Sequence, residues 1–211
     1  RFFFLMTALT SIVSLSLIMI YLFLEGAPIF RHVSVKDFLF GSFWYPTFDP
    51  PEFGIFPLIV ASVAVTLLSS VIAIPLGILQ AIRRGRFIDR AATSVSYLLY
   101  ATPSFLIALV LIGVFSQAIP LFPAEASQST SPWVVFTDPR AMALPLITLA
   151  VTNVVVFAQY QRSSALEQLG MDYIKVARAK GASERIVLTR HLLRNAITPI
   201  ITLVGVLIPT L

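Results

Sequence analysis

Four apolar runs, each long enough to form a helix across a lipid bilayer, dominate this chain. A helix needs about 20 apolar residues to cross the hydrocarbon core, because each residue rises about 1.5 Å. The runs are Phe2–Leu24, Ile55–Ile82, Ala91 to about Ile119, and Ala141–Gln161, and a shorter fifth begins at Ala196–Leu211. The sequence therefore predicts an all-α, polytopic transmembrane helical bundle of about five spans, in which the last span is truncated.

The composition also points to a lipid environment. Hydrophobic residues make up 57% of the chain and charged residues 12%, whereas soluble domains carry roughly 25% charged residues. The net charge of +5 comes from basic residues between the apolar runs, without the aromatic-interleaved basic face of a nucleic-acid binder. The chain has no cysteine, which excludes disulfides and thiol chemistry. We expect the lipid bilayer, and no nucleic acid, as its surroundings.

The connecting segments alternate in charge, which predicts their sides of the membrane. Arg83–Arg90 holds four arginines and one aspartate, and Arg162–Asn195 holds seven basic and three acidic residues. Glu25–Gly54 and Pro120–Arg140 together hold three basic and six acidic residues. Because Lys and Arg accumulate in cytoplasmic loops, the first two segments are expected in the cytoplasm and the other two outside. The N-terminus is then cytoplasmic.

The predicted spans contain no Asp, Glu, Lys, Arg or His. Proton-coupled and sodium-coupled carriers usually place such residues inside the bundle, so a secondary carrier is the weaker alternative. Neutral polar side chains do occur in the spans, and each has two open uses: hydrogen bonds between helices, worth roughly 0.6–2 kcal/mol, or the lining of a translocation path. These residues are Thr66, Ser69, Ser70, Asn153 and Gln159.

The segment Arg162–Asn195 is too polar for the membrane, yet its apolar residues recur at helical spacing. Tyr173–Lys180 is predicted to be a short helix that ends at Gly181, where a C-terminal cap favours a positive φ. Ser183 followed by Glu184 is typical of the start of the next helix. The sequence therefore predicts a short helix, a sharp turn and another helix.

A short basic helix of this kind has three possible uses. It could lie on the membrane, where Lys175, Arg178 and Lys180 would each gain about 1 kcal/mol near anionic headgroups. It could belong to an ordinary solvated loop. It could also dock a cytoplasmic partner, whose motion would then reach the spans. The residues alone leave these three uses open.

The amino-acid sequence of this segment resembles a known family motif. Glu167–Ser183 reads EQLGMDYIKVARAKGAS and Arg190–Ala196 reads RHLLRNA. Together they resemble the EAA loop of permeases of binding-protein-dependent ABC importers, in the form of the dipeptide, oligopeptide and nickel branch. Lys175 and Val176 stand where many relatives have Glu and Ala, and Arg194 stands where they have Pro. Those departures are typical of the peptide branch.

The resemblance implies a fold and a division of labour. It implies the type I ABC importer permease fold, with a permease core at 55–211 that includes the coupling loop at 162–195, preceded by a first helix and external segment at 1–54. In this family the loop's helix docks into a groove of the ATP-hydrolysing subunit. The implied coupling residues are Tyr173, Ala177, Arg178, Ala179, Lys180, Gly181, Ala182 and Ser183.

The resemblance also implies partners. We expect two separate ATPase subunits that bind ATP and Mg, a second permease subunit in a homodimer or heterodimer, and an extracytoplasmic solute-binding protein. The expected location is the bacterial inner membrane. The chain has no G-x-x-x-x-G-K-[ST] loop. It is therefore expected to have no ATPase, catalytic, cofactor or metal site of its own.

Different segments of the chain resemble permeases for different cargoes. Gln80–Arg90 and Thr102–Leu106 are similar to peptide-branch permeases, whereas Glu25–Phe30 and Phe43–Ile55 are similar to phosphate-importer permeases. A peptide or nickel cargo is expected, phosphate stays open, and so does a mosaic chain. The external aromatic residues Trp44, Tyr45 and Phe48 could meet a binding protein or form an interfacial aromatic belt.

Two smaller points complete the prediction. His32 and His191 are predicted on opposite sides of the membrane, so they cannot share a metal ion or a proton. Asp89 is expected to pair locally with Arg86 or Arg90 as an exposed ion pair, worth about 0–1 kcal/mol. An intramembrane enzyme would need a catalytic set such as paired aspartates, and the predicted spans contain none.

Overall fold

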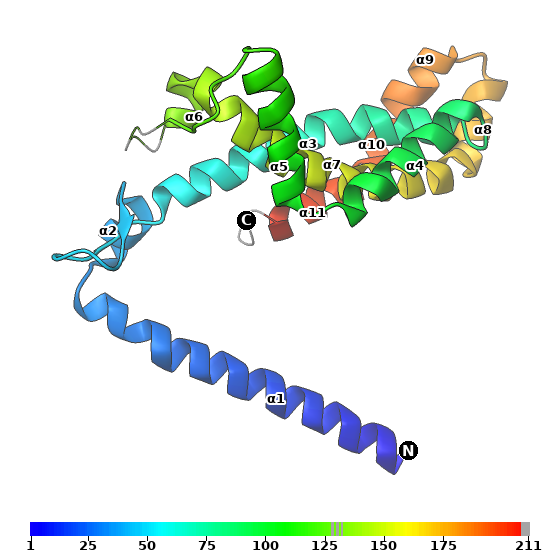
Figure 1. Ribbon diagram of the computed structural model, residues 1–211. Helices are drawn as coiled ribbons and strands as arrows, with labels where there is room; N and C mark the ends of the chain where they lie inside the picture. Colours follow the sequence, from blue (N-terminus) through cyan, green and yellow to red (C-terminus); the bar gives the residue numbers. More distant parts are fainter. Residues whose placement is uncertain (128, 130, 132, 208–211) are drawn as a thin grey trace. The chain divides into compact units, whose positions relative to one another are not determined.

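The computed structural model describes residues 1–127, 129, 131 and 133–207, and helices carry nearly all of the regular structure in that part of the chain (Figure 1). The chain divides into two compact units, Arg1–Phe56 and Pro57–Leu211. The predicted all-α class is confirmed. Each unit is described by itself below.

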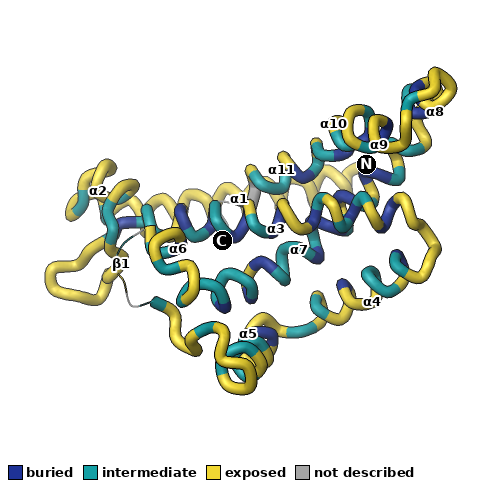
Figure 2. The backbone as a smooth tube through the Cα atoms, turned by 90° about the horizontal axis from the view of Figure 1, so that it is seen from above, coloured by how far each residue is buried: buried dark blue, intermediate teal, exposed yellow. Residues whose placement is uncertain are grey.

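The first unit begins with the long helix α1 (Phe2–Gly26), which continues into the 3-10 turn η1 (Ala27–Arg31). No residue of α1 is buried, as Figure 2 shows by its colour. Because the helix is apolar on all sides, water is an unfavourable environment for it, and a lipid bilayer or an apolar partner is required. The first predicted span is thus confirmed as a helix.

A small folded segment follows α1. Helix α2 (Val35–Phe40) starts at Ser34, whose hydroxyl accepts a hydrogen bond from the Asp37 amide at 3.1 Å. Strands β1 (Trp44–Tyr45) and β2 (Glu52–Phe53) then form a short antiparallel hairpin, in which Trp44 is opposite Phe53. This hairpin is an addition to the predicted all-helical organisation.

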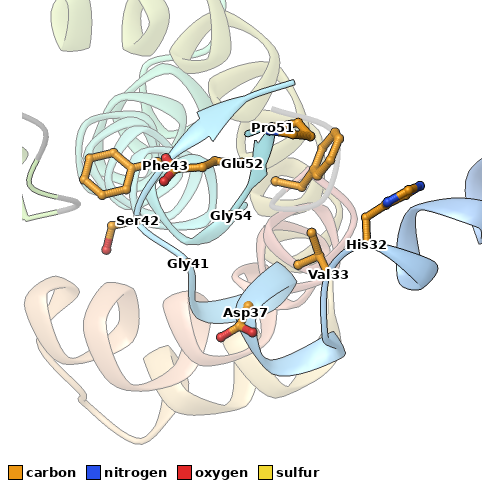
Figure 3. A pocket seen from close by; sticks show the side chains of 10 residues that line it. His32, Val33, Asp37, Gly41, Ser42, Phe43, Pro51, Glu52 and Gly54 are labelled. Carbon is orange, nitrogen blue, oxygen red and sulfur yellow. The ribbon is translucent and has the colours of Figure 1, made fainter. Parts of the chain in front are cut away.

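A cavity of about 250 Å³ lies within this segment (Figure 3). Its wall comes from the turn before α2 with His32, from α2 itself, from the link that follows it and from β2 with Pro51, and it includes the exposed carboxylates Asp37 and Glu52. The figure shows the backbone at Gly41 passing between Asp37 and the hairpin. The cavity is therefore an acidic hollow in the segment that the charge pattern predicts to be external.

The second unit contains the remaining helices. Its first helix, α3, starts at Phe56, the last residue of the first unit. The longer ones are α3 (Phe56–Ile82), α4 (Phe87–Ala101), α5 (Ser104–Ile112), α7 (Pro139–Leu169), α8 (Asp172–Ala179) and α11 (Thr198–Leu207). The shorter ones are α6 (Val134–Thr137), α9 (Glu184–Ile186), α10 (Leu193–Ala196) and the π-helical turns η2 (Gly113–Ala118) and η3 (Val187–Leu192).

Three helical segments are long and apolar enough to cross a membrane among the described residues: Phe2–Arg31, Phe56–Ile82 and Pro139–Leu169. They correspond to the first, second and fourth predicted spans, which are confirmed. Helix α7 continues two turns beyond the predicted end at Gln161, because Arg162 and the residues after it remain helical. The predicted loop at 162–195 therefore begins inside a rigid helix.

The predicted third span is not one continuous helix. The run from Ala91 to about Ile119 forms two helices, α4 and α5, which meet at an angle of 105°. The cause is Pro103, which has no backbone N–H and disfavours helical geometry in the residue before it. Thr102 accordingly adopts an extended conformation, with ψ of 124°. The pair is a broken span or a re-entrant loop.

The predicted fifth run begins at Ala196, the last residue of the short helix α10, and continues after a break at Ile197 as α11. Its last residues, 208–211, lie outside the described part of the chain. The described part of this run packs on α7 through Ile200, which is 2% exposed.

The core of the second unit consists of two apolar clusters along α3 and α7 (Figure 2). One joins α3, α7 and α11 through Ala73, Phe157, Ala158 and Ile200. The other joins α3 and α7 to α8, η3 and α10 through Ala81, Ala165, Ile174, Ala177, Val187, Leu192 and Ala196. Because most members are small, the helix backbones approach closely. The helix α8 is thus part of the core and not a loose loop.

Two fully buried glutamines, Gln80 on α3 and Gln161 on α7, are interspersed along these helices between cluster residues. Neither amide has a hydrogen-bond partner within the described residues. A buried unsatisfied polar group costs about 1–3 kcal/mol. We therefore expect Gln80→Met, which keeps the length and removes the polar atoms, to leave the free energy of unfolding unchanged or to raise it by about 1 kcal/mol.

Thermal unfolding of the detergent-extracted protein measures this effect, with Gln161→Met as a second, independent replacement. A drop in stability of more than about 1 kcal/mol in both variants would show that the two amides have partners, such as buried water.

Candidate coupling site

The candidate site is the helix α8 and the turn that follows it. Helix α8 begins after Met171, whose extended backbone separates it from α7. Asp172 lies in its first turn and Arg178 in its last, and both charges are favourable in the field of the helix dipole. Lys175 donates a hydrogen bond to Asp172 at 2.8 Å and lowers the pKa of that carboxyl. Local electrostatics therefore stabilise an otherwise short helix.

One face of α8 is packed against the bundle. Ile174 is fully buried and Ala177 is 8% exposed, and both belong to the apolar cluster around Ala165, Val187 and Leu192. The Tyr173 hydroxyl donates a hydrogen bond to the Gln168 side-chain oxygen at 2.7 Å, which ties α8 back to the end of α7. Direct contacts therefore join α8 to α7.

The opposite face of α8 is exposed and basic. Its exposed side chains are Asp172, Lys175, Val176, Arg178 and Ala179, and the exposed Lys180 follows directly after the helix. Lys175 pairs with Asp172, and the face as a whole is net basic. The first described acidic group beyond the helix is Glu184, which pairs with Arg178. The surface thus offers small and cationic groups to a cytoplasmic partner or to anionic lipid.

The turn after α8 has the geometry of a Schellman motif. Gly181 has φ of +80°, its amide donates to the Arg178 carbonyl at 2.9 Å, and the Ala182 amide donates to the Ala177 carbonyl at 3.1 Å. The prediction that Gly181 ends this helix with a positive φ is confirmed. An added Cβ at this glycine would meet nothing within 4 Å in the described chain. The requirement for glycine is therefore conformational and not steric.

A second connection closes the turn. The Arg178 guanidinium donates two hydrogen bonds to the Glu184 carboxylate, at 2.8 and 3.1 Å, and so joins the end of α8 to the start of α9. The ion pair raises the pKa of Arg178. Ser183 precedes α9 with extended backbone, as predicted, although its side chain makes no capping hydrogen bond. Because both partners of the pair are exposed, its contribution to stability is small.

The eight sequence-predicted coupling residues thus lie in one helix and its turn, and they divide into two groups. Tyr173 and Ala177 face the bundle, and Ala182 is half-buried. Arg178, Ala179, Lys180, Gly181 and Ser183 are exposed. The exposed group is the more accessible of the two to a partner in this conformation.

The predicted path residues lie in different environments. Thr66, Ser69 and Ser70 are buried on α3, and the Ser69 hydroxyl donates to the Val65 carbonyl at 2.7 Å and contacts the Ala150 carbonyl on α7 at 3.3 Å. Asn153 and Gln159 are half-buried on α7. Gln159 also lines a cavity of about 300 Å³ beside the α4 tyrosines Tyr97 and Tyr100. Their role in a path stays a prediction.

Sequence reasoning missed one partly buried ion pair. Asp89 was expected to pair locally with Arg86 or Arg90, but it binds Arg162, 73 positions away. The reason is that α4 and α7 lie side by side, with Asp89 near the start of α4 and Arg162 near the end of α7. Asp89 lies on α4 and Arg162 on α7, just outside the predicted spans, which contain no charged residue. Both helices therefore extend beyond those spans. A solitary carboxylate among four arginines was the available signal.

Among the described residues, no three His, Asp or Glu side chains gather as a metal site would require. The fold and the site together define a polytopic helical membrane protein in which a short basic helix and its glycine turn are packed onto the spanning helices.

Residues 73–211 match the family described as "Binding-protein-dependent transport system inner membrane component", and the chain belongs to this family. It is 36% identical over 156 residues to the dipeptide transport system permease protein DppB of Bacillus subtilis (strain 168), which covers 74% of this chain and 47% of the relative. It is 38% identical over 146 residues to the oligopeptide transport system permease protein AppB of the same strain, which covers 69% and 46%.

A third relative is similar over more of the chain. The metal-staphylopine import system permease protein CntB of Staphylococcus aureus (strain Mu50 / ATCC 700699) is 34% identical over 181 residues, or 84% of this chain and 55% of the relative. This match must include part of the region before residue 73, because the family match alone covers a smaller share. The chain spans about half the length of the curated relatives it matches. The resemblance of the early segments to phosphate-importer permeases stays a prediction.

Proposed function

We propose that this chain forms the core of the permease subunit of an ATP-binding-cassette importer, which lines part of a translocation path and is driven by separate ATPase subunits. One observation carries the proposal: α8 packs Ile174 and Ala177 into the core while its basic face and the Gly181 turn stay exposed. Such an element can bind a partner on one side and transmit its motion on the other. The family membership and the names of the relatives support the same function.

The proposal includes a full set of partners. Two ATPase subunits would bind ATP and Mg²⁺, a second permease of the same or a different sequence would complete the path, and an extracytoplasmic solute-binding protein would deliver the cargo. The charge pattern supports a cytoplasmic N-terminus and cytoplasmic positions for 83–90 and 162–195 in the bacterial inner membrane. The acidic hollow near Asp37 and Glu52 would then face the binding protein.

The proposed cargo is a peptide or a metal chelate, because the relatives carry these cargoes in their names. In the proposed cycle, ATP binding brings the two ATPase subunits together and displaces the two α8 helices of the permease pair. Each α8 displaces its own α7 through the shared apolar cluster. The spans then alternate between inward-open and outward-open arrangements. Arg178, Lys180 and Gly181 would contact the ATPase, whereas Tyr173 and Ala177 would anchor the helix.

The exposed turn gives a direct test. We expect Gly181→Val to reduce the amount of ATPase that co-purifies with the permease about tenfold, because a β-branched residue at positive φ costs roughly 1–2 kcal/mol and distorts the turn. The measurement is co-purification of the full-length permease encoded by the genome with its candidate ATPases, after extraction from membranes.

Gly181→Asn is the matched control, since asparagine is similar in size to valine but tolerates positive φ. It should retain most of the ATPase. If the valine variant retains as much ATPase as the wild type, the turn is not the docking element. If the wild type retains none of the candidate ATPases, the proposed function itself is wrong.

A further inference from the structure

Asp89 is the most heavily hydrogen-bonded carboxylate of the described residues. The Arg162 guanidinium donates to its two oxygens at 2.8 and 3.0 Å, and the Gly85 amide donates to one of them at 2.8 Å. The Asp89 side chain is 6% exposed and that of Arg162 25% exposed. This fork-to-fork arrangement is geometrically specific, because the planar guanidinium fits the carboxylate in one orientation.

The local structure aims Asp89 at both partners. Gly85 has φ of +73°, and the positive φ turns the chain sharply between α3 and α4. Helix α4 begins after Arg86, which provides no side-chain cap, so the carboxylate of Asp89 in the first turn reaches back to the Gly85 amide. A single carboxylate therefore joins the α3–α4 turn, the start of α4 and the helix α7.

Helix α4 has few other attachments. Asp89 and Ser96 are its buried residues, while the large side chains of Tyr97, Leu98 and Tyr100 are exposed. Apolar burial, which fastens most helices to their neighbours, is thus weak here. A partly buried ion pair adds little net stability, but it fixes one arrangement because either charge left alone is costly.

The position of Arg162 links the ion pair to the candidate coupling element. Arg162 lies on α7 at a point where α3 and α7 approach closely, since a Cβ added to Gly77 would be 2.9 Å from the Arg162 amide. Helix α7 then continues without interruption to Leu169, directly before α8. The pair therefore attaches α4 to the same helix that carries the candidate coupling element.

We propose that Asp89 and Arg162 are positioning residues that fasten α4 to α7, so that a displacement of α8 moves α4 together with α7. This inference rests on the proposed function for its role in coupling, but the attachment itself does not. Without the pair, the ATPase would still dock on α8 and hydrolyse ATP, while α4 would follow the motion poorly. Loss of the pair therefore uncouples hydrolysis from transport.

The attachment can be measured directly because residues 1–211 contain no cysteine that a spin label would also modify. Spin labels on Leu98→Cys of α4 and Glu167→Cys of α7, both at exposed positions, report the distance between the two helices in the assembled transporter by pulsed electron resonance. We expect a single narrow distribution for the otherwise wild-type protein. Asp89→Asn should at least double the width of that distribution, and Arg162→Lys, which keeps the charge and loses the fork, should give an intermediate width.

Coupling is measured in the same variants as uptake of a labelled dipeptide per ATP hydrolysed, after reconstitution with the ATPase and the binding protein. Asp89→Asn should lower this ratio at least tenfold while the ATPase still co-purifies. Glu125→Gln, which removes an exposed carboxylate in the second unit, should change neither the width nor the ratio.

An unchanged distance distribution in both Asp89→Asn and Arg162→Lys would overturn the proposal. A broadened distribution with a wild-type ratio of uptake to hydrolysis would overturn the coupling role. Failure of the wild type to retain any ATPase would count against the proposed function, whereas the distance measurement would still decide whether the pair fastens α4. If Asp89→Asn is not recovered from membranes, Arg162→Lys decides the same question.

Discussion

Replacing Ile174 with alanine is expected to lower the free energy of unfolding of the second unit by about 2–5 kcal/mol. Ile174 is fully buried within the apolar cluster. Its neighbours in that cluster include the small residues Ala165 and Ala177, which cannot extend to fill the space. The truncation therefore leaves a cavity at the contact that holds α8 on the bundle.

The same change should weaken docking, because an α8 that detaches from the cluster no longer presents its basic face in a fixed orientation. Thermal unfolding in detergent measures the stability, and co-purification with the ATPase measures docking. Val176→Ala is the matched control on the same helix, since Val176 is 49% exposed and its truncation should cost less than about 0.5 kcal/mol. Equal losses of thermal stability for Ile174→Ala and Val176→Ala would show that α8 is not held by the cluster.

The elements that the sequence predicts well are those defined by local patterns. Apolar length predicted α1, α3 and α7, because a helix that crosses lipid must be apolar over a fixed number of residues. The helix over Tyr173–Lys180 differs from α8 by one residue at each end. Gly181 was identified as the end of this helix because few other residues adopt positive φ. Helical spacing of apolar residues, Ile174, Val176 and Ala177 among them, also predicted that this segment is helical. It did not separate the buried Ile174 and Ala177 from the exposed Val176.

The bend at Thr102 could have been predicted from Pro103, but hydropathy alone does not detect it. The run around it is apolar throughout, so length alone predicted one span. Pro103 nevertheless removes a backbone donor and restricts Thr102, and the structure has a 105° bend at this point. The hairpin of β1 and β2 is a different case, since two-residue strands are too short to show an alternating pattern.

The Asp89–Arg162 pair marks the limit of reasoning from sequence. Nothing in the spacing of two residues 73 positions apart says that they meet. Their contact depends on how α4 and α7 pack, which local propensity does not specify. Sequence could show only that Asp89 was the single carboxylate in an arginine-rich turn, and a local partner was the simplest expectation. The buried glutamines Gln80 and Gln161 were not singled out for the same reason.

A close contact between α3 and α7 in the second unit gives the last large effect, because Gly77 on α3 has no room for a side chain. An added Cβ would lie 2.7 Å from the Ala158 carbonyl oxygen and 2.9 Å from the Arg162 amide nitrogen, and both are backbone atoms of α7. We expect Gly77→Ala to cost about 3 kcal/mol, at the upper end for overpacking, since α3 and α7 must separate.

Separation of α3 from α7 at Gly77 also displaces Arg162, so the variant should broaden the α4–α7 distance distribution as Asp89→Asn does. Gly113→Ala is the control, because Gly113 has helical dihedral angles and a Cβ there would meet nothing within 4 Å. That change should be neutral, or stabilising by up to about 1 kcal/mol, since alanine is the better helix former. Thermal unfolding of both variants in the same detergent separates the two effects, and a Gly77→Ala protein as stable as Gly113→Ala would show that α3 and α7 are not in close contact.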